Sequence, residues 1–182
     1  VQRAAGLERS QVARRSDPEE PKSVSNERTF GEDLTDEAEI RAAILHIAGI
    51  VGGRLRKKGL KGSTVTLKIK YDAMTGRSAQ ARLSAPTDEE RAFGKEALAL
   101  LPQLWSPGMR VRLLGVGVSG FDQPEPLQLG LFADPEEKKN EEASALSRAC
   151  DELKTRFGDA AVRYGRDLRF DGRVSDTQPQ GK

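Results

Sequence analysis

Residues 57–71, KKGLKGSTVTLKIKY, combine cationic side chains with the alternation of a strand. One face of the predicted strand carries Val65, Leu67, Ile69 and Tyr71, and the other carries Thr64, Thr66, Lys68 and Lys70. Residues 50–85 hold nine Lys and Arg against one acid, a local excess of +8 in a chain whose net charge is +2. Such a concentration of charge is typical of a phosphate-binding surface, although a face that only keeps the domain soluble gives the same pattern.

The composition indicates a small folded core with polar extensions. Of the 182 residues, 36% are hydrophobic and 32% are charged. The one cysteine, Cys150, excludes an internal disulfide, so we expect a reducing, cytoplasmic setting. We expect no membrane association, because no apolar run approaches the roughly 20 residues that span a bilayer. The chain begins at Val1 within a helix-like pattern, so we expect it to be a fragment of a longer protein.

The predicted elements follow the order β-α-β-β-α-β over about 100 residues, which is the split βαβ arrangement of an α+β domain. This arrangement is a four-stranded sheet with two helices on one face and the other face open. The strands are expected at residues 22–30, 64–71, 77–84 and 110–119, with a hairpin turn at Thr75-Gly76. The first helix is expected to have Thr35 as its N-cap and to end at Gly59. The second is expected to open with a capping box, Thr87 to Glu90, and to end or kink at Pro102, before Trp105.

The flanking regions have the composition of linkers and tails. Residues 1–21 are expected to be the end of a preceding domain and a linker. Residues 122–143 contain three prolines and seven acids against two lysines, which predicts a disordered acidic linker. Residues 144–170 are expected to hold a short helix that ends in a turn at Gly158, and residues 171–182 a disordered tail.

Three blocks of the sequence resemble one known domain family. KSVSNERTFGEDLTDE, LRKKGLKGSTVTLKIKY and VRLLGVGVSGF, in this order, resemble the little-finger domain of Y-family translesion DNA polymerases, most closely the bacterial DNA polymerase IV type. The match covers residues 22–121. It implies a monomeric module that grips primer–template DNA by its backbone, independently of sequence, during lesion bypass and repair. The catalytic palm and its Mg²⁺ ions would lie in another part of the parent polymerase, so we expect this chain to have no catalytic residue, metal or activity of its own.

The charge pattern and the resemblance together predict a set of DNA contacts. The central hairpin supplies Lys68, Lys70, Ser78 and Arg82, and the resemblance adds the first-strand residues Lys22, Ser23, Ser25 and Arg28. Phosphate contacts supply affinity without base specificity, as a polymerase that accepts any template requires. Each cation could instead be an ordinary surface charge. Family hairpins often carry further arginines where this chain has Ala79 and Ala81.

A pentapeptide in the acidic linker resembles the peptide with which bacterial polymerases bind the ring-shaped sliding clamp. Its predicted clamp-binding residues are Gln128, Leu129, Leu131 and Phe132. Short tethered peptides bind modestly, and the tether raises the local concentration. The alternative is that the apolar side chains fold back onto the domain.

Two other functional classes fit parts of the sequence. A free-standing adaptor that binds DNA or the clamp would differ from a polymerase fragment only in what precedes Val1. An RNA-binding sheet is disfavoured, because the strands lack paired aromatic residues on which bases could stack. His46 has no second His or nearby Cys to complete a metal site, so we do not expect it to bind a metal.

Overall fold

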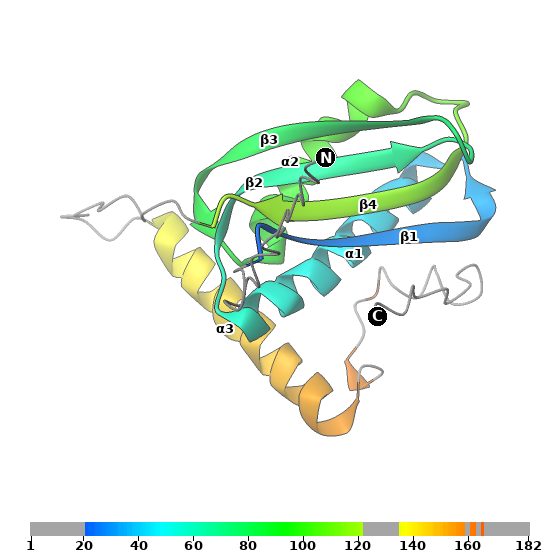
Figure 1. Cartoon of the computed structure of the whole chain (residues 1–182). Helices are drawn as coiled ribbons and strands as arrows, with labels where there is room; N and C mark the ends of the chain where they lie inside the picture. Colours follow the sequence, from blue (N-terminus) through cyan, green and yellow to red (C-terminus); the bar gives the residue numbers. More distant parts are fainter. Residues whose placement is uncertain (1–20, 122–134, 159–160, 163–164, 166–182) are drawn as a thin grey trace, which may run out of the picture.

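The computed structural model describes residues 21–121, 135–158, 161–162 and 165. The described residues form a single four-stranded sheet and three helices, arranged as an α+β fold (Figure 1). The elements are β1 (Ser23–Leu34), α1 (Glu37–Lys58), β2 (Gly62–Lys70), β3 (Gly76–Thr87), α2 (Glu90–Leu104), β4 (Val111–Ser119) and α3 (Pro135–Phe157). The predicted β-α-β-β-α-β order is therefore confirmed. None of the helices in the described part combines the length and hydrophobicity needed to cross a bilayer.

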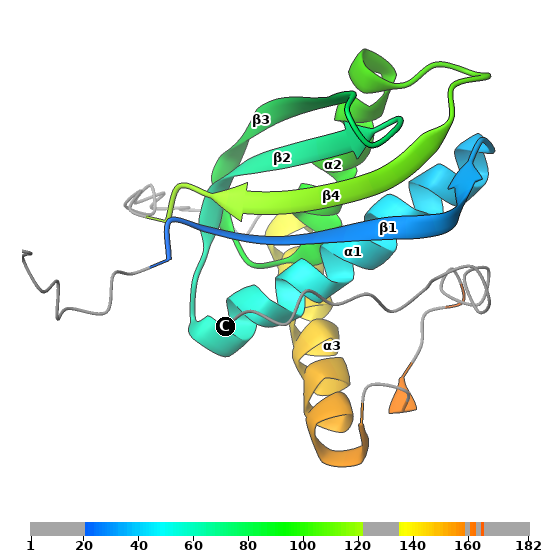
Figure 2. The same ribbon diagram turned by 45° about the vertical axis from the view of Figure 1, so that its right-hand side comes forward.

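The sheet has the order β1-β4-β2-β3, and every neighbouring pair is antiparallel. The two central strands are β4 and β2, and α1 and α2 lie together against one face, as Figure 2 shows. The predicted alternation decides which residues meet the helices: Val65, Leu67 and Ile69 of β2 are fully buried. They pack with the apolar stripe of α1 and with Phe93 of α2. Among the described residues, no helix covers the opposite face of the sheet (Figure 2).

Both predicted N-caps differ from the observed ones. Helix α1 is capped by Asp36 instead of Thr35, and its carboxylate accepts a hydrogen bond from the Glu39 amide at 2.9 Å. The N-cap of α2 is Glu89, which makes no side-chain cap bond. The Thr87 hydroxyl accepts from the Glu89 amide at 3.1 Å, but the Glu90 carboxylate bonds Arg56 of α1, so the capping box is incomplete.

The structure confirms one other predicted boundary and corrects another. Helix α2 runs through Pro102 and ends at Leu104, directly before Trp105 as predicted, so the proline lies inside its last turn. Helix α3 begins at Pro135, within the stretch predicted to be a disordered linker, and ends at Phe157 before Gly158, whose φ is +91°.

The β2–β3 hairpin turn lies just before the position predicted for it. Asp72 Oδ1 accepts hydrogen bonds from the amides of Met74, at 2.7 Å, and Thr75, at 2.6 Å. These amide donors, Thr75 first, lower the pKa of the Asp72 carboxyl below its ordinary value. Gly76 is already the first residue of β3. The short turn places β3 alongside β2 and thereby sets the register of the open face.

Candidate nucleic-acid interface

The open face of the sheet is built from four rows of residues that are paired across β1, β4, β2 and β3. In that strand order the rows are Ser23–Ser119–Thr64–Arg82, Ser25–Gly117–Thr66–Gln80, Glu27–Gly115–Lys68–Ser78 and Thr29–Leu113–Lys70–Gly76. Together they carry three cations and one acid. Most other members are small residues with hydroxyl groups, or glycine. A polyanion could therefore approach the backbone of this face closely.

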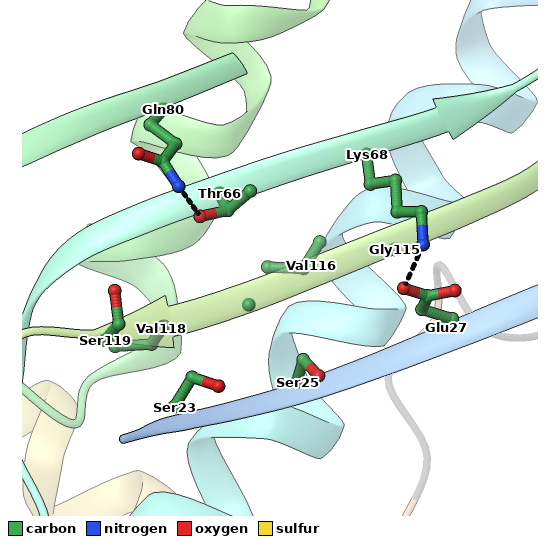
Figure 3. Close-up of a pocket in the computed structure, with 11 residues that line it drawn as sticks. Ser23, Ser25, Glu27, Thr66, Lys68, Gln80, Gly115, Val116, Val118 and Ser119 are labelled. Carbon is green, nitrogen blue, oxygen red and sulfur yellow. Dashed lines mark hydrogen bonds and ion pairs between the residues drawn. The ribbon is translucent and has the colours of Figure 1, made fainter. Parts of the chain in front are cut away.

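A shallow trough runs along β4 on this face, because Gly115 and Gly117 have no side chains there. The trough encloses a hollow of about 270 Å³ and is shown in Figure 3. Ser25 and Glu27 line it on the β1 side, and Thr66 and Lys68 line it on the β2 side. A β-carbon at Gly117 would lie 3.3 Å from that of Ser25, so even an alanine would narrow the trough.

One ion pair crosses the trough. Lys68 Nζ lies 2.8 Å from Glu27 Oε1, although the two residues belong to strands that are separated by β4. Both side chains remain open to solvent, with 39% of Lys68 and 42% of Glu27 exposed. In the next row, Gln80 Nε2 donates to Thr66 Oγ1 at 3.1 Å (Figure 3). Lys68 is thus partly neutralised by a residue that the sequence analysis did not assign to the site.

The structure places six of the eight predicted DNA contacts on the open face. They are Ser23, Ser25, Lys68, Lys70, Ser78 and Arg82. Lys22 lies one residue before β1 and outside the sheet pairing. In the part of the chain that the structure describes, Lys70 has no ion-pair partner.

Arg28, which was predicted as a DNA contact, does not lie on the open face. It pairs across the ladder with Leu114, whose side chain is buried in the core, and it shares the phase of Val24 and Phe30. Its guanidinium Nη1 lies 2.7 Å from His46 Nε2 of α1. Arg28 therefore lies on the helix side of the sheet. His46 lies on a partly buried flank of α1 in contact with Arg28.

The alanines of β3 also belong to the helix side. Ala79 and Ala81 are partly buried against the core. Arginines at these two positions would not point to the open face, so their absence does not reduce its charge.

On the helix side, a second polar cluster joins three helices. Arg56 near the end of α1 donates to Glu90 Oε2 of α2 at 2.6 Å and to Asp151 Oδ2 of α3 at 2.5 Å. Burial alone would lower the pKa of Arg56, but hydrogen bonds and charges from Asp151 and Glu90 raise it above its ordinary value. Arg56 is 9% exposed and Glu90 is 4% exposed, so this pair is far better shielded than Lys68–Glu27.

Glu89 completes this helix-side cluster, and no described Lys or Arg forms an ion pair with it. The Ser147 hydroxyl lies 3.1 Å from Glu89 Oε1 and 3.3 Å from Glu90 Oε1. The other carboxyl oxygen of Glu89 is buried and has no hydrogen-bond partner in the part of the chain that the structure describes. Burial, followed by the charge of Glu90, raises the pKa of the Glu89 carboxyl. The cluster therefore connects α3 to α1 and α2.

Among the described residues, no group of three or more His, Cys, Asp or Glu could hold a metal ion.

Comparisons with known proteins agree with this architecture. The model of the impB/mucB/samB family C-terminal domain matches residues 21–131. The chain belongs to this family. It is 35% identical over 150 residues to DNA polymerase IV of Opitutus terrae, covering 82% of this chain and 37% of that protein. It is 42% identical over 118 residues to DNA polymerase IV of Alkalilimnicola ehrlichii, covering 62% of this chain and 32% of that protein.

The predicted resemblance to the little finger of bacterial DNA polymerase IV is thereby confirmed. The chain spans less than half the length of these relatives. A solved complex of the beta-clamp processivity factor with the little finger domain of PolIV aligns with a TM-score of 0.47 and 25% identity, covering 61% of this chain and 99% of that one. The predicted clamp-binding residues Gln128, Leu129, Leu131 and Phe132 lie outside the described residues.

Proposed function

We propose that the chain binds the backbone of primer–template DNA on the open face of its sheet, as part of a polymerase of the DNA polymerase IV type. The observation that carries this proposal is the glycine-floored trough, which is flanked by hydroxyl groups and has Lys68, Lys70 and Arg82 on the same face. Small side chains let phosphates approach the sheet, and cations attract them. None of these groups needs to reach a base edge, so binding would be independent of sequence.

The parent protein would use this grip during lesion bypass and DNA repair, with its Mg²⁺-dependent chemistry in a separate palm. The chain would act as a monomer. A free-standing DNA- or clamp-binding adaptor is the alternative, and the coding sequence before Val1 would distinguish it from a polymerase fragment. Residues 128–132 would add a tether to the sliding clamp, in which Leu131 and Phe132 supply the apolar anchors and Gln128 a polar contact.

A salt titration of DNA binding tests the proposed surface. Fluorescence anisotropy with a labelled primer–template duplex would give the affinity of the full chain between about 50 and 200 mM salt. Each lost phosphate contact reduces the magnitude of the slope of log K against log salt by about 0.9, so Lys70→Glu/Arg82→Glu should reduce it by about 2. The matched control is Arg91→Glu/Lys95→Glu, which reverses two exposed charges on α2, behind the sheet. Equal slopes for both double variants would refute the assignment of DNA binding to the open face.

A further inference from the structure

We propose that Glu27 is a built-in competitor of DNA for Lys68: its carboxylate holds the lysine across the trough in the free chain, and phosphate binding requires an exchange of partners. This inference rests on the proposed DNA-binding function and adds to it a residue that sets the affinity. The ligand would be a phosphodiester of the DNA backbone, which would replace the Glu27 carboxylate as the partner of the Lys68 ammonium group.

The geometry places the competitor where the ligand would lie. Glu27 lies on β1 and Lys68 on β2, and these two strands are not neighbours in the sheet. Their side chains meet above Gly115 of β4, the strand between them (Figure 3). A β-carbon at Gly115 would lie 2.9 Å from Glu27 Cγ, so the bridge depends on the glycine beneath it. The 2.8 Å contact therefore lies across the trough, over its floor.

The exposure of the pair makes exchange feasible. About two fifths of each side chain is open to solvent, with 39% of Lys68 and 42% of Glu27 exposed. Ion pairs this exposed contribute little to stability, because water and salt screen them. The pair therefore has a negligible structural role in comparison with the shielded Arg56–Glu90 pair, whose members are 9% and 4% exposed.

Glu27 reduces DNA affinity in either bound state. If Lys68 stays with Glu27, the protein forgoes one phosphate contact. If Lys68 moves to a phosphate, the carboxylate is left unpaired beside a polyanion and repels it. Removing the charge of Glu27 thus gains one contact without adding any new cation. This sets Glu27 apart from the predicted contacts, whose removal can only weaken binding.

The same anisotropy titration on the full chain tests this inference. With Glu27→Gln the magnitude of the salt slope should rise by about 0.9, which corresponds to about eightfold tighter binding at 0.1 M salt. Glu27→Ser, which copies the residue type at positions 23 and 25, should give a similar gain. Lys68→Gln should weaken binding in the wild-type chain, because it leaves the Glu27 carboxylate unpaired beside the DNA, and it should remove the gain when combined with Glu27→Gln.

Glu37→Gln is the matched control, because it removes one carboxylate from an exposed ion pair on α1, behind the sheet. Unchanged affinity and slope in both Glu27 variants, with the loss in Lys70→Glu/Arg82→Glu still present, would overturn this inference alone. An equal gain from Glu37→Gln would also overturn it, since the effect would then be one of net charge. Absence of DNA binding by the wild-type chain would refute the proposed function and this inference together.

Discussion

Replacement of Arg56 by methionine should be one of the most destabilising single changes in the domain. The guanidinium is 9% exposed and holds the 4% exposed carboxylate of Glu90, as well as Asp151 of α3. Methionine keeps much of the packing volume but leaves Glu90 buried without its cation. Breaking a buried pair from one side costs about 3–5 kcal/mol, so the free energy of unfolding should fall by about that amount.

Urea unfolding followed by tryptophan fluorescence measures this loss. Trp105 is the only tryptophan of the chain and is 6% exposed at the end of α2, so its emission reports on the core. Arg41→Met is the matched control, because it breaks an exposed ion pair on the same helix, with side chains 46% and 55% exposed. Its cost should stay below about 0.5 kcal/mol.

Two further variants separate the charge effect from the packing effect. Arg56→Met/Glu90→Met replaces the whole buried pair with apolar side chains and should recover most of the stability that Arg56→Met loses. Asp151→Asn weakens only the contact with α3 and should cost about 1–2 kcal/mol, since Asp151 is 33% exposed. If Arg56→Met is no more costly than Arg41→Met, the helix-side cluster does not stabilise the domain as we describe.

The remaining predictions concern the pH dependence of stability and capture by the clamp. The raised pKa of Glu89 means that its contribution to stability is present below the unfolded value of about 4.5 and is lost as the pH rises through the folded value. Glu89→Gln should therefore gain stability relative to wild type as the pH rises above about 4.5; a difference in unfolding midpoint that does not vary with pH would contradict this. Leu131→Ala/Phe132→Ala should abolish binding to an immobilised bacterial sliding clamp and leave the DNA affinity unchanged, whereas retained capture would remove these residues from the clamp contact.

The parts of the fold set by local pattern could be predicted from the sequence. The alternation in β2 correctly placed Lys68 and Lys70 on the face opposite Leu67, because neighbouring side chains on a strand point to opposite faces. The same rule could have placed Arg28, since it shares the phase of Val24 and Phe30. The sequence pattern alone does not decide between Thr35 and Asp36 as the N-cap of α1, because both are good capping residues.

The contacts that depend on strand order and helix docking could not be predicted. Glu27 and Lys68 are 41 residues apart and meet only because β4 lies between β1 and β2 with a glycine at the crossing point. Arg56 and Asp151 are 95 residues apart and belong to separate helices. Neither pair has a local sequence signal. The one acid that changes the charge of the trough therefore became visible only in the folded structure.

The central claim is that DNA lies on the open face of the sheet, and amide chemical-shift mapping by NMR tests it most directly. On titration of the isotope-labelled full chain with a primer–template duplex, the account predicts that the largest shifts fall on the trough residues Ser25, Thr66 and Gly117. Shifts concentrated on α1 and α2, with those three amides unmoved, would contradict it.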